Sequence, residues 1–373
     1  MLADTTEKEN VIRLLLSGVE DNITLGLQIA KSVKIDLSDL ENDLTILFDW
    51  IGKYKAYSFG RKLRQLHQIT TLYSTEKRAT DIPSQIQYLV NLSILDLPSP
   101  LSSLPAEIGN LSKLDQLYCS FNQLSSLPPE IGKLTQLSVL HLQANGLTSI
   151  PATIGNLCNV EKLRLEGNKL TYLPTEMGKL AQLKELTLQR NQLTTLPIEI
   201  GNLNRLEDLE LWQNKITDLP NEIGNLTSLR ILQLSQNLLT RVPAQLGNLL
   251  NLGDLSLKDN RLTSLPAEIG GLTRLKSLNL GKNQLSALPP KISKLAKLSH
   301  LSLEYNQLTS LPREIGKMTQ LEFLCLSVNQ LTHLPDEIGN LSNLQTLVLV
   351  NNPLPDSEKE RITSMLPHCQ IHY

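Results

Sequence analysis

The sequence is poor in the residues that define several common classes of protein. Aromatic residues make up only 4% of its 373 residues, and 35 basic side chains nearly balance 37 acidic ones. The chain therefore lacks the basic surface with which proteins neutralise nucleic-acid phosphates. No apolar run is long enough to span a bilayer. We expect neither nucleic acid nor a membrane as a partner.

Cysteine is also scarce, and its four copies lie far apart. Cys119, Cys158, Cys325 and Cys369 form no CxxC pair and no close cluster, so we predict neither a disulfide framework nor a zinc site. The N-terminal residues are acidic where a secretory signal is basic, and the apolar run at 14–16 is too short for such a signal. These features predict a cytoplasmic protein.

Motifs of catalysis and cofactor binding are missing from the sequence. It contains no GxxxxGK[ST], no HExxH, and no GxGxxG between a strand and a helix. The six histidines are scattered, and none pairs with a cysteine or serine in a recognisable nucleophile motif. We therefore predict that the protein is not an enzyme and that it holds no cofactor or metal.

A repeat with a period of 23 residues fills most of the chain. Proline recurs at this step from Pro105 through Pro128 to Pro335. Asparagine keeps the same step without a slip, at Asn122, Asn145, Asn168, Asn191, Asn214, Asn237, Asn260, Asn283, Asn306, Asn329 and Asn352. Such strict self-similarity predicts stacked units, each of which needs neighbours to bury its apolar face.

One unit, "LEDLELWQNKITDLP" at 206–220, shows what each repeat does. Leu209 and Leu211 alternate with polar residues, which predicts a short strand with its leucines turned inward. Strands separated by a full coil must be parallel. The amide of Asn214, where the chain leaves the strand, can satisfy backbone groups that the turn would leave unpaired. Pro220 favours an extended segment, and "NEIGNL" then predicts a short helical or 3₁₀ turn.

The phrase LxxLxLxxNxLTxLPxEIGxLxx, over residues 69 to 352, resembles the leucine-rich repeat superfamily. It is similar to the 23-residue class of intracellular Ras-group and polarity-scaffold proteins, plant intracellular relatives and many bacterial proteins. The resemblance implies an α/β fold: a curved right-handed solenoid with a parallel sheet on its concave face and short 3₁₀ or helical turns on its convex face. It also implies a protein ligand. A small GTPase is one partner that the Ras-group relatives suggest.

The two ends of the chain depart from the repeat. Residues 1–65 show helical spacing, and we predict a helical cap or a small helical interaction domain there. Residues 66–352 then form about 12 to 13 coils, and 353–373 a C-terminal cap whose "PHCQIHY" closes the sheet. The first coils are irregular because Ser74, Lys77 and Ser99 replace repeat residues. Predicted N-terminal helix signals are Asn22, the pair Ser38 and Glu41, and the pair Ser357 and Glu360.

The residues that alternate with the core leucines are free to carry function, because they point to the concave side. In the N-terminal half several are large or charged: Tyr118, Phe121, His141, Arg164, Glu166, Arg190, Glu210 and Trp212. Tyr, Trp and Arg are enriched at binding hot spots, so we predict that this set binds a protein ligand. The alternative is that Trp212 packs against neighbouring side chains and binds nothing.

A more apolar group lies near the C-terminus, and we expect the C-terminal cap to cover it. Its members are Tyr305, Phe323, Cys325, Val328, Val348 and Val350. Two functional hypotheses remain. The first is a monomeric, non-enzymatic scaffold that binds a protein, and a bacterial effector-type protein acting on host proteins is an alternative to it. The second is a structural protein that assembles with itself.

Overall fold

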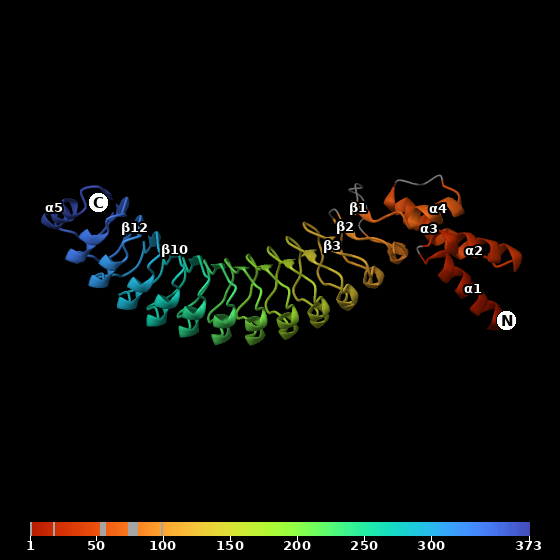
Figure 1. Cartoon of the computed structure of the whole chain (residues 1–373), viewed down its shortest axis with the longest axis horizontal. Coiled ribbons are helices and arrows are strands. Elements are labelled where there is room, and N and C mark those ends of the chain that lie inside the picture. The colour runs from red at the N-terminus through yellow and green to blue at the C-terminus, as the bar shows by residue number, and fades with distance from the viewer. Residues whose placement is uncertain (1, 18, 53–56, 74–80, 98–99) are drawn as a thin grey trace. The chain divides into compact units, whose positions relative to one another are not determined.

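The computed structural model describes residues 2–17, 19–52, 57–73, 81–97 and 100–373 (Figure 1). The irregular positions Ser74, Lys77 and Ser99 lie outside these residues. The chain divides into two compact units, Met1–Arg164 and Leu165–Tyr373, which we call unit 1 and unit 2. The division falls within the repeats.

Unit 1 begins with α-helices that pack on one another. Their bounds are α1 Leu2–Leu15, α2 Glu20–Ser32, α3 Ser38–Ile51 and α4 Phe59–Leu66. Helix α1 contacts α2, and both α2 and α3 contact α4. The side chains of Leu15, Leu44, Phe48 and Leu63 are fully buried between them. Burial of this apolar surface stabilises the helical segment.

The predicted helix signals were wrong in position. Helix α2 begins at Glu20, so Asn22 lies within its first turn and donates to the Ser17 hydroxyl at 3.0 Å. Ser38 is the first residue of α3, and its amide donates to Asp36 at 2.9 Å. Neither helix has a side-chain N-cap hydrogen bond. Acidic residues in both first turns stabilise the helix dipole instead.

The coils of unit 1 follow the helices. Each coil joins a three-residue strand to a 3₁₀ turn: β1 Thr71–Tyr73, η1 Ser84–Tyr88, β2 Ile94–Asp96, η2 Ala106–Asn110, β3 Gln116–Tyr118, η3 Pro129–Lys133, β4 Val139–His141, η4 Ala152–Asn156 and β5 Lys162–Arg164. Adjacent strands pair in parallel and in register. Turn η1 of the first coil contacts α3.

Unit 2 continues the same pattern and ends in a cap. Its strands are β6 Glu185–Thr187, β7 Asp208–Glu210, β8 Ile231–Gln233, β9 Asp254–Ser256, β10 Ser277–Asn279, β11 His300–Ser302, β12 Phe323–Cys325, β13 Thr346–Val348 and β14 Gln370–His372. Its helical turns are η5 Thr175–Lys179, η6 Ile198–Asn202, η7 Asn221–Asn225, η8 Ala244–Asn248, η9 Ala267–Gly271, η10 Pro290–Lys294, η11 Arg313–Lys317 and η12 Asp336–Asn340, followed by α5 Asp356–Met365. The strands of unit 2 lie on the inner side of its bend and the turns on the outer side (Figure 1).

The core of each coil consists of the repeat's aliphatic residues. In one coil Leu206, Leu209, Leu211 and Ile223 are all fully buried. Glycine follows the buried isoleucine of most turns because adjacent turns approach closely: a Cβ on Gly201 would lie 2.5 Å from a backbone oxygen of the next turn. The turn spacing therefore depends on this residue having no side chain.

The repeated asparagines connect neighbouring coils through their buried amides. The Asn214 Oδ1 accepts from the Leu193 amide at 3.0 Å, and its Nδ2 donates to the carbonyls of Leu188 at 2.9 Å and Leu211 at 3.0 Å. The same three bonds occur at Asn145, Asn191, Asn237, Asn260, Asn283, Asn306, Asn329 and Asn352. Each side chain thus satisfies backbone groups of two coils that would otherwise be buried without partners.

The residue before each asparagine adopts the left-handed conformation. Its φ lies between 53° and 59° at Phe121, Ala144, Arg190, Gln213, Gln236, Asp259, Lys282, Tyr305, Val328 and Asn351, and Gly167 takes this place in one coil. A side chain makes this conformation costly by about 1–2 kcal/mol. Hydrogen bonds from these amides to the next coil, such as Arg190 to Trp212 at 2.9 Å, offset the cost.

The C-terminal cap extends the sheet, and its helix contacts η12. Strand β14 pairs with β13 in parallel, so Val348 lies opposite His372. Helix α5 starts at Asp356, and the predicted pair Ser357 and Glu360 makes no capping box. Glu358 holds the helix to the coil instead: its carboxylate accepts from the Leu334 amide at 2.8 Å.

Candidate protein-binding face

The last residue of each three-residue strand lies beside the last residue of the next strand, so these residues form a row across the sheet. In unit 1 the register places Tyr73, Asp96, Tyr118, His141 and Arg164 side by side on neighbouring strands. Because their neighbours along each strand are core leucines, these five side chains lie on the opposite, open face. Unit 1 therefore carries a continuous row of aromatic and charged groups.

Tyr118 and His141 form the centre of that row. Their rings meet edge to face, with centroids 4.9 Å apart and planes at 89°. The Tyr118 hydroxyl donates to the Gln116 amide oxygen at 2.8 Å. Partial burial raises the pKa of Tyr118, and nearby carboxylates add to this while Arg164 opposes it. The phenol therefore stays neutral at ordinary pH and offers a hydrogen bond and an apolar ring.

Phe121 belongs to the same region, but it lies beyond the end of strand β3. Its backbone is in the left-handed turn, and its side chain is 69% exposed. The sequence had predicted it on the sheet itself. The ring therefore adds an exposed apolar group close to Tyr118 and takes no part in the core.

The 23-residue spacing does not predict Tyr73 and Asp96 on this face. They continue the row because the second coil is one residue short. Asp96 therefore pairs with Tyr118 although the two residues are not a full 23-residue repeat apart. Tyr73, one full repeat before Asp96, pairs with Asp96 in turn. Tyr73 is 54% exposed, and burial raises the pKa of Asp96. A search that allowed one deletion in the repeat would have found both residues.

In unit 2 the corresponding region is centred on Trp212. The Arg190 guanidinium lies 4.9 Å from the centroid of the Trp212 ring, a cation–π contact. The Arg190 Nε donates to the Gln213 side-chain oxygen at 3.0 Å, and the Trp212 Nε1 contacts the Glu210 carboxylate at 3.4 Å. The indole is thus held between a cation and an anion while remaining partly exposed.

The predicted site residues divide between the units. Tyr118, Phe121, His141 and Arg164 belong to unit 1, and Glu166, Arg190, Glu210 and Trp212 belong to unit 2. Glu166 accepts a hydrogen bond from the Thr187 hydroxyl at 2.5 Å. Like Phe121, Arg190 lies at a left-handed turn position and not on a strand.

Farther along unit 2 the open face becomes smaller and polar. The hydroxyls of Ser235 and Ser256 share a hydrogen bond of 2.6 Å, and the Glu304 carboxylate pairs with Lys258 at 3.2 Å across Gly281. These groups satisfy one another. This part of the face therefore offers less to a partner than the region around Trp212.

The apolar group near the C-terminus is not covered by the cap, contrary to expectation. Tyr305 is 53% exposed, and Phe323, Val348 and Val350 are partly exposed. The reason is that β14 adds to the edge of the sheet and α5 contacts η12, so neither segment lies over the open face.

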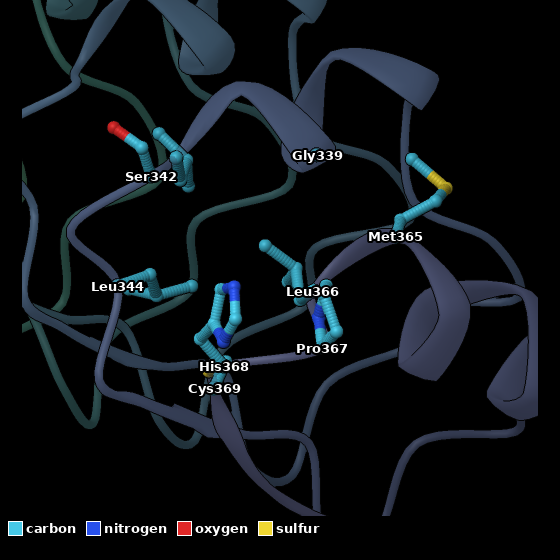
Figure 2. Close-up of a pocket in the computed structure, with 9 residues that line it drawn as sticks. Gly339, Ser342, Leu344, Met365, Leu366, Pro367, His368 and Cys369 are labelled. Atoms are coloured by element: carbon cyan, nitrogen blue, oxygen red, sulfur yellow. The ribbon is translucent and has the colours of Figure 1, made fainter.

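A small cleft of about 190 Å³ lies under the cap (Figure 2). Gly339, Leu344 and Met365 are among its lining residues, together with His368 and Cys369. Partial burial raises the pKa of the Cys369 thiol, so the group is protonated at neutral pH and a poor nucleophile.

Across residues 2–17, 19–52, 57–73, 81–97 and 100–373, no three His, Cys, Asp or Glu side chains lie close enough together to hold a metal ion. In the same part of the chain no helix combines the length and the apolar character that a membrane span needs.

The parallel strands, the 3₁₀ turns and the asparagine network define a repeat solenoid with N-terminal helices. A family model described as "Leucine-rich repeat region" matches residues 72–186, 167–259 and 243–366. The chain therefore belongs to the leucine-rich repeat proteins, which confirms the predicted family and fold class.

Solved structures agree with this assignment. A leucine-rich repeat protein of Leptospira interrogans is 40% identical, with a TM-score of 0.66 over 79% of this chain and 82% of the other. An internalin of Listeria monocytogenes is 26% identical, with a TM-score of 0.70 over 90% and 94% of the two chains. The plant peptide hormone receptor RGFR1, solved in complex with RGF2, is 32% identical, with a TM-score of 0.61 over 78% and 52%. A search of curated proteins gave no match.

Proposed function

We propose that the protein is a non-enzymatic recognition module that binds a folded protein through the open face of its sheet. The observation that carries this proposal is the Arg190 and Trp212 pair. It holds an indole and a guanidinium on the open face, while Leu209 and Leu211 of the same coil are buried in the core. Tyr, Trp and Arg dominate binding energy at protein interfaces.

Two further observations support the proposal. Tyr118 and His141 place a second aromatic cluster on the open face of unit 1. Among similar structures, RGFR1 was solved with RGF2 and Toll with Spatzle, so the fold serves protein ligands in those cases. The same proposal includes a monomeric state and a cytoplasmic location. The argument for the location is that all four cysteines are free.

The test uses one pair of substitutions in each unit. Arg190→Ala with Trp212→Ala removes the unit 2 cluster, and Tyr118→Ala with His141→Ala removes the unit 1 cluster. Tyr172→Ala is the matched control, since Tyr172 is 54% exposed and lies off the strands. Proteins captured from lysate of the native cell by the wild type are identified by mass spectrometry, and the purified partner is then titrated calorimetrically.

We expect the unit 2 variant to raise the Kd at least about tenfold, a loss of about 1.4 kcal/mol, because hot-spot truncations cost this much or more. The control should bind like the wild type. The thermal transitions of all variants should remain nearly unchanged, because the substituted side chains lie outside the leucine core. Equal binding by the wild type and both double variants would refute the open face as the site.

The hypothesis of self-assembly makes a different prediction. A protein that stacks with itself shows a sedimentation coefficient that rises with concentration, whereas the proposed module sediments as a monomer over the same range. Concentration-dependent mass in the absence of a partner would therefore favour the structural role.

A further inference from the structure

The residue directly before each strand forms a second column, at the edge of the sheet. In unit 2 this column includes Glu207, Arg230, Gly253, Lys276 and Ser299. Because Gly253 has no side chain, it leaves a gap in an otherwise continuous row of side chains.

The backbone at Gly253 does not require glycine. Its φ lies outside the left-handed region, and a Cβ would meet only the Arg230 carbonyl, at an ordinary 3.6 Å. Gly253 donates to the Arg230 carbonyl at 2.8 Å, as Lys276 donates to the Gly253 carbonyl at 2.9 Å. Because its neighbours with full side chains make the same bonds, the missing side chain has no conformational explanation.

The gap opens into a groove with cationic walls. The groove has a volume of about 560 Å³, and Arg230, Arg274, Lys276 and Lys297 line it. A smaller hollow of about 300 Å³ adjoins it and shares Arg230 and Arg274. Ile231, which is 37% exposed, supplies an apolar contact in the groove.

Among the described residues, most of this positive charge has no ion-pair partner. Arg230 pairs with Glu207 at 3.3 Å, while Arg274 contacts only the Asn251 amide oxygen, at 2.6 Å. In unit 2, every residue of which is described, no carboxylate lies within ion-pair distance of Arg274, Lys276 or Lys297. The one carboxylate in the groove, Asp254, accepts from the Gln233 amide at 2.6 Å. The walls therefore attract an external anion.

The extent of the groove indicates the kind of anion. The column becomes acidic on both sides, at Glu207 and Glu322, so the cationic strip is only a few coils long. A nucleic-acid strand needs a longer cationic track with aromatic stacking groups, and the groove lining contains no aromatic residue. A short acidic peptide matches both the length and the mixed cationic and aliphatic lining.

We propose that the groove at Gly253 is a second docking site, which takes a short segment of a partner protein rich in Asp and Glu. It lies at the start of β8, β9 and β10, separate from the cluster around Trp212. Carboxylates of the segment pair with Arg274, Lys276 and Lys297, and the backbone of the segment occupies the space that a side chain at 253 would fill.

The test measures fluorescence anisotropy of a fluorescein-labelled hexaglutamate peptide at low ionic strength. Two variants test separately whether peptide binding depends on the charge of the groove and on its shape. Arg274→Glu with Lys276→Glu reverses the walls, and Gly253→Leu fills the groove while keeping every charge. Lys294→Glu with Lys317→Glu is the control, because it makes the same change in net charge on the outer turns η10 and η11. Thermal melts verify that each variant is folded.

We expect both groove variants to weaken binding at least about tenfold, and the control to weaken it less than about twofold. Arg190→Ala with Trp212→Ala should leave peptide binding intact, which separates this site from the proposed open-face site. Equal weakening by the control pair would overturn the proposal, as would unchanged binding by Gly253→Leu. Tighter binding of a short oligothymidylate at the same site would also overturn it in favour of nucleic acid.

Discussion

The first and last coils are joined to their flanking helices by different chemistry. At the N-terminal end, the Asp43 carboxylate of α3 accepts from the Tyr88 hydroxyl at 2.7 Å and the Gln85 amide at 2.9 Å. At the C-terminal end, the Glu358 carboxylate of α5 accepts from the Leu334 amide at 2.8 Å and from the Arg361 guanidinium at 2.6 Å. Both junction carboxylates accept from neutral donors of the coil, and Glu358 also accepts from a cation of its own helix, Arg361.

This difference gives the two junctions opposite dependence on pH. Burial, followed by the hydrogen bond to Asp43, raises the pKa of Tyr88 to about 12. The Arg361 guanidinium, followed by the Leu334 amide, lowers the pKa of Glu358. The contribution of the Tyr88 hydrogen bond is therefore lost in alkali, and that of the Glu358 carboxylate is lost in acid. An interior coil, held by an uncharged amide, has neither dependence.

The largest expected effect is at an interior coil, which the uncharged amide of Asn214 holds to its neighbour. Asn214→Ala should lower the free energy of unfolding by about 1–3 kcal/mol, because it leaves buried backbone groups of Leu188 and Leu193 without partners. Urea denaturation followed by circular dichroism measures the change. Gln213→Ala is the control and should cost less than about 0.5 kcal/mol, since Gln213 is exposed. Similar losses in both variants would contradict the structural role of the asparagine.

Glu358→Ala should have the next largest effect, about 2 kcal/mol, because it removes charge-assisted hydrogen bonds to Leu334 and Arg361. The folded pKa of Glu358 lies below its ordinary value, so the contribution is present above about pH 4.5 and disappears as pH falls through the lowered pKa. Hydrogen exchange of the α5 amides reports the loss locally. Glu360→Ala, on the exposed side of the same helix, should leave that exchange unchanged.

Tyr88→Phe should have the smallest effect of the three, about 1 kcal/mol, because it removes one hydrogen bond to Asp43 and little apolar area. The folded pKa is raised, so the wild type's advantage over the variant is present below pH 10 and disappears as pH rises through about 12. Denaturation of both proteins across that range measures it. An advantage that persisted above pH 12 would contradict the assigned hydrogen bond.

The repeat was predictable from the sequence because its physical causes are local and repeated. A 23-residue step in Asn and Leu determines which residues enter the core, and strand alternation then assigns the open face. Trp212 and Tyr118 were placed on that face by this reasoning alone. Whether they bind a protein stays a prediction.

Other features were not predictable because they depend on contacts between coils. Phe121 and Arg190 were placed on strands, but the turn that accommodates each asparagine puts the preceding residue in the left-handed conformation. The predicted helix signals at Asn22, Ser38 and Ser357 failed because helix starts depend on where packing ends the preceding segment. For the same reason the sequence pattern indicated Glu360 as the partner of Ser357, whereas Glu358 is the residue that contacts the last coil.

The sequence by itself determined the repeating unit, the parallel order of strands and the identity of the buried residues, because each follows from periodic burial. Only the tertiary structure decided which side chains meet across coils: Arg190 with Trp212, Asp43 with Tyr88, and the cations that surround Gly253. These pairs are about one coil or more apart in sequence, and their contact depends on how closely neighbouring coils stack.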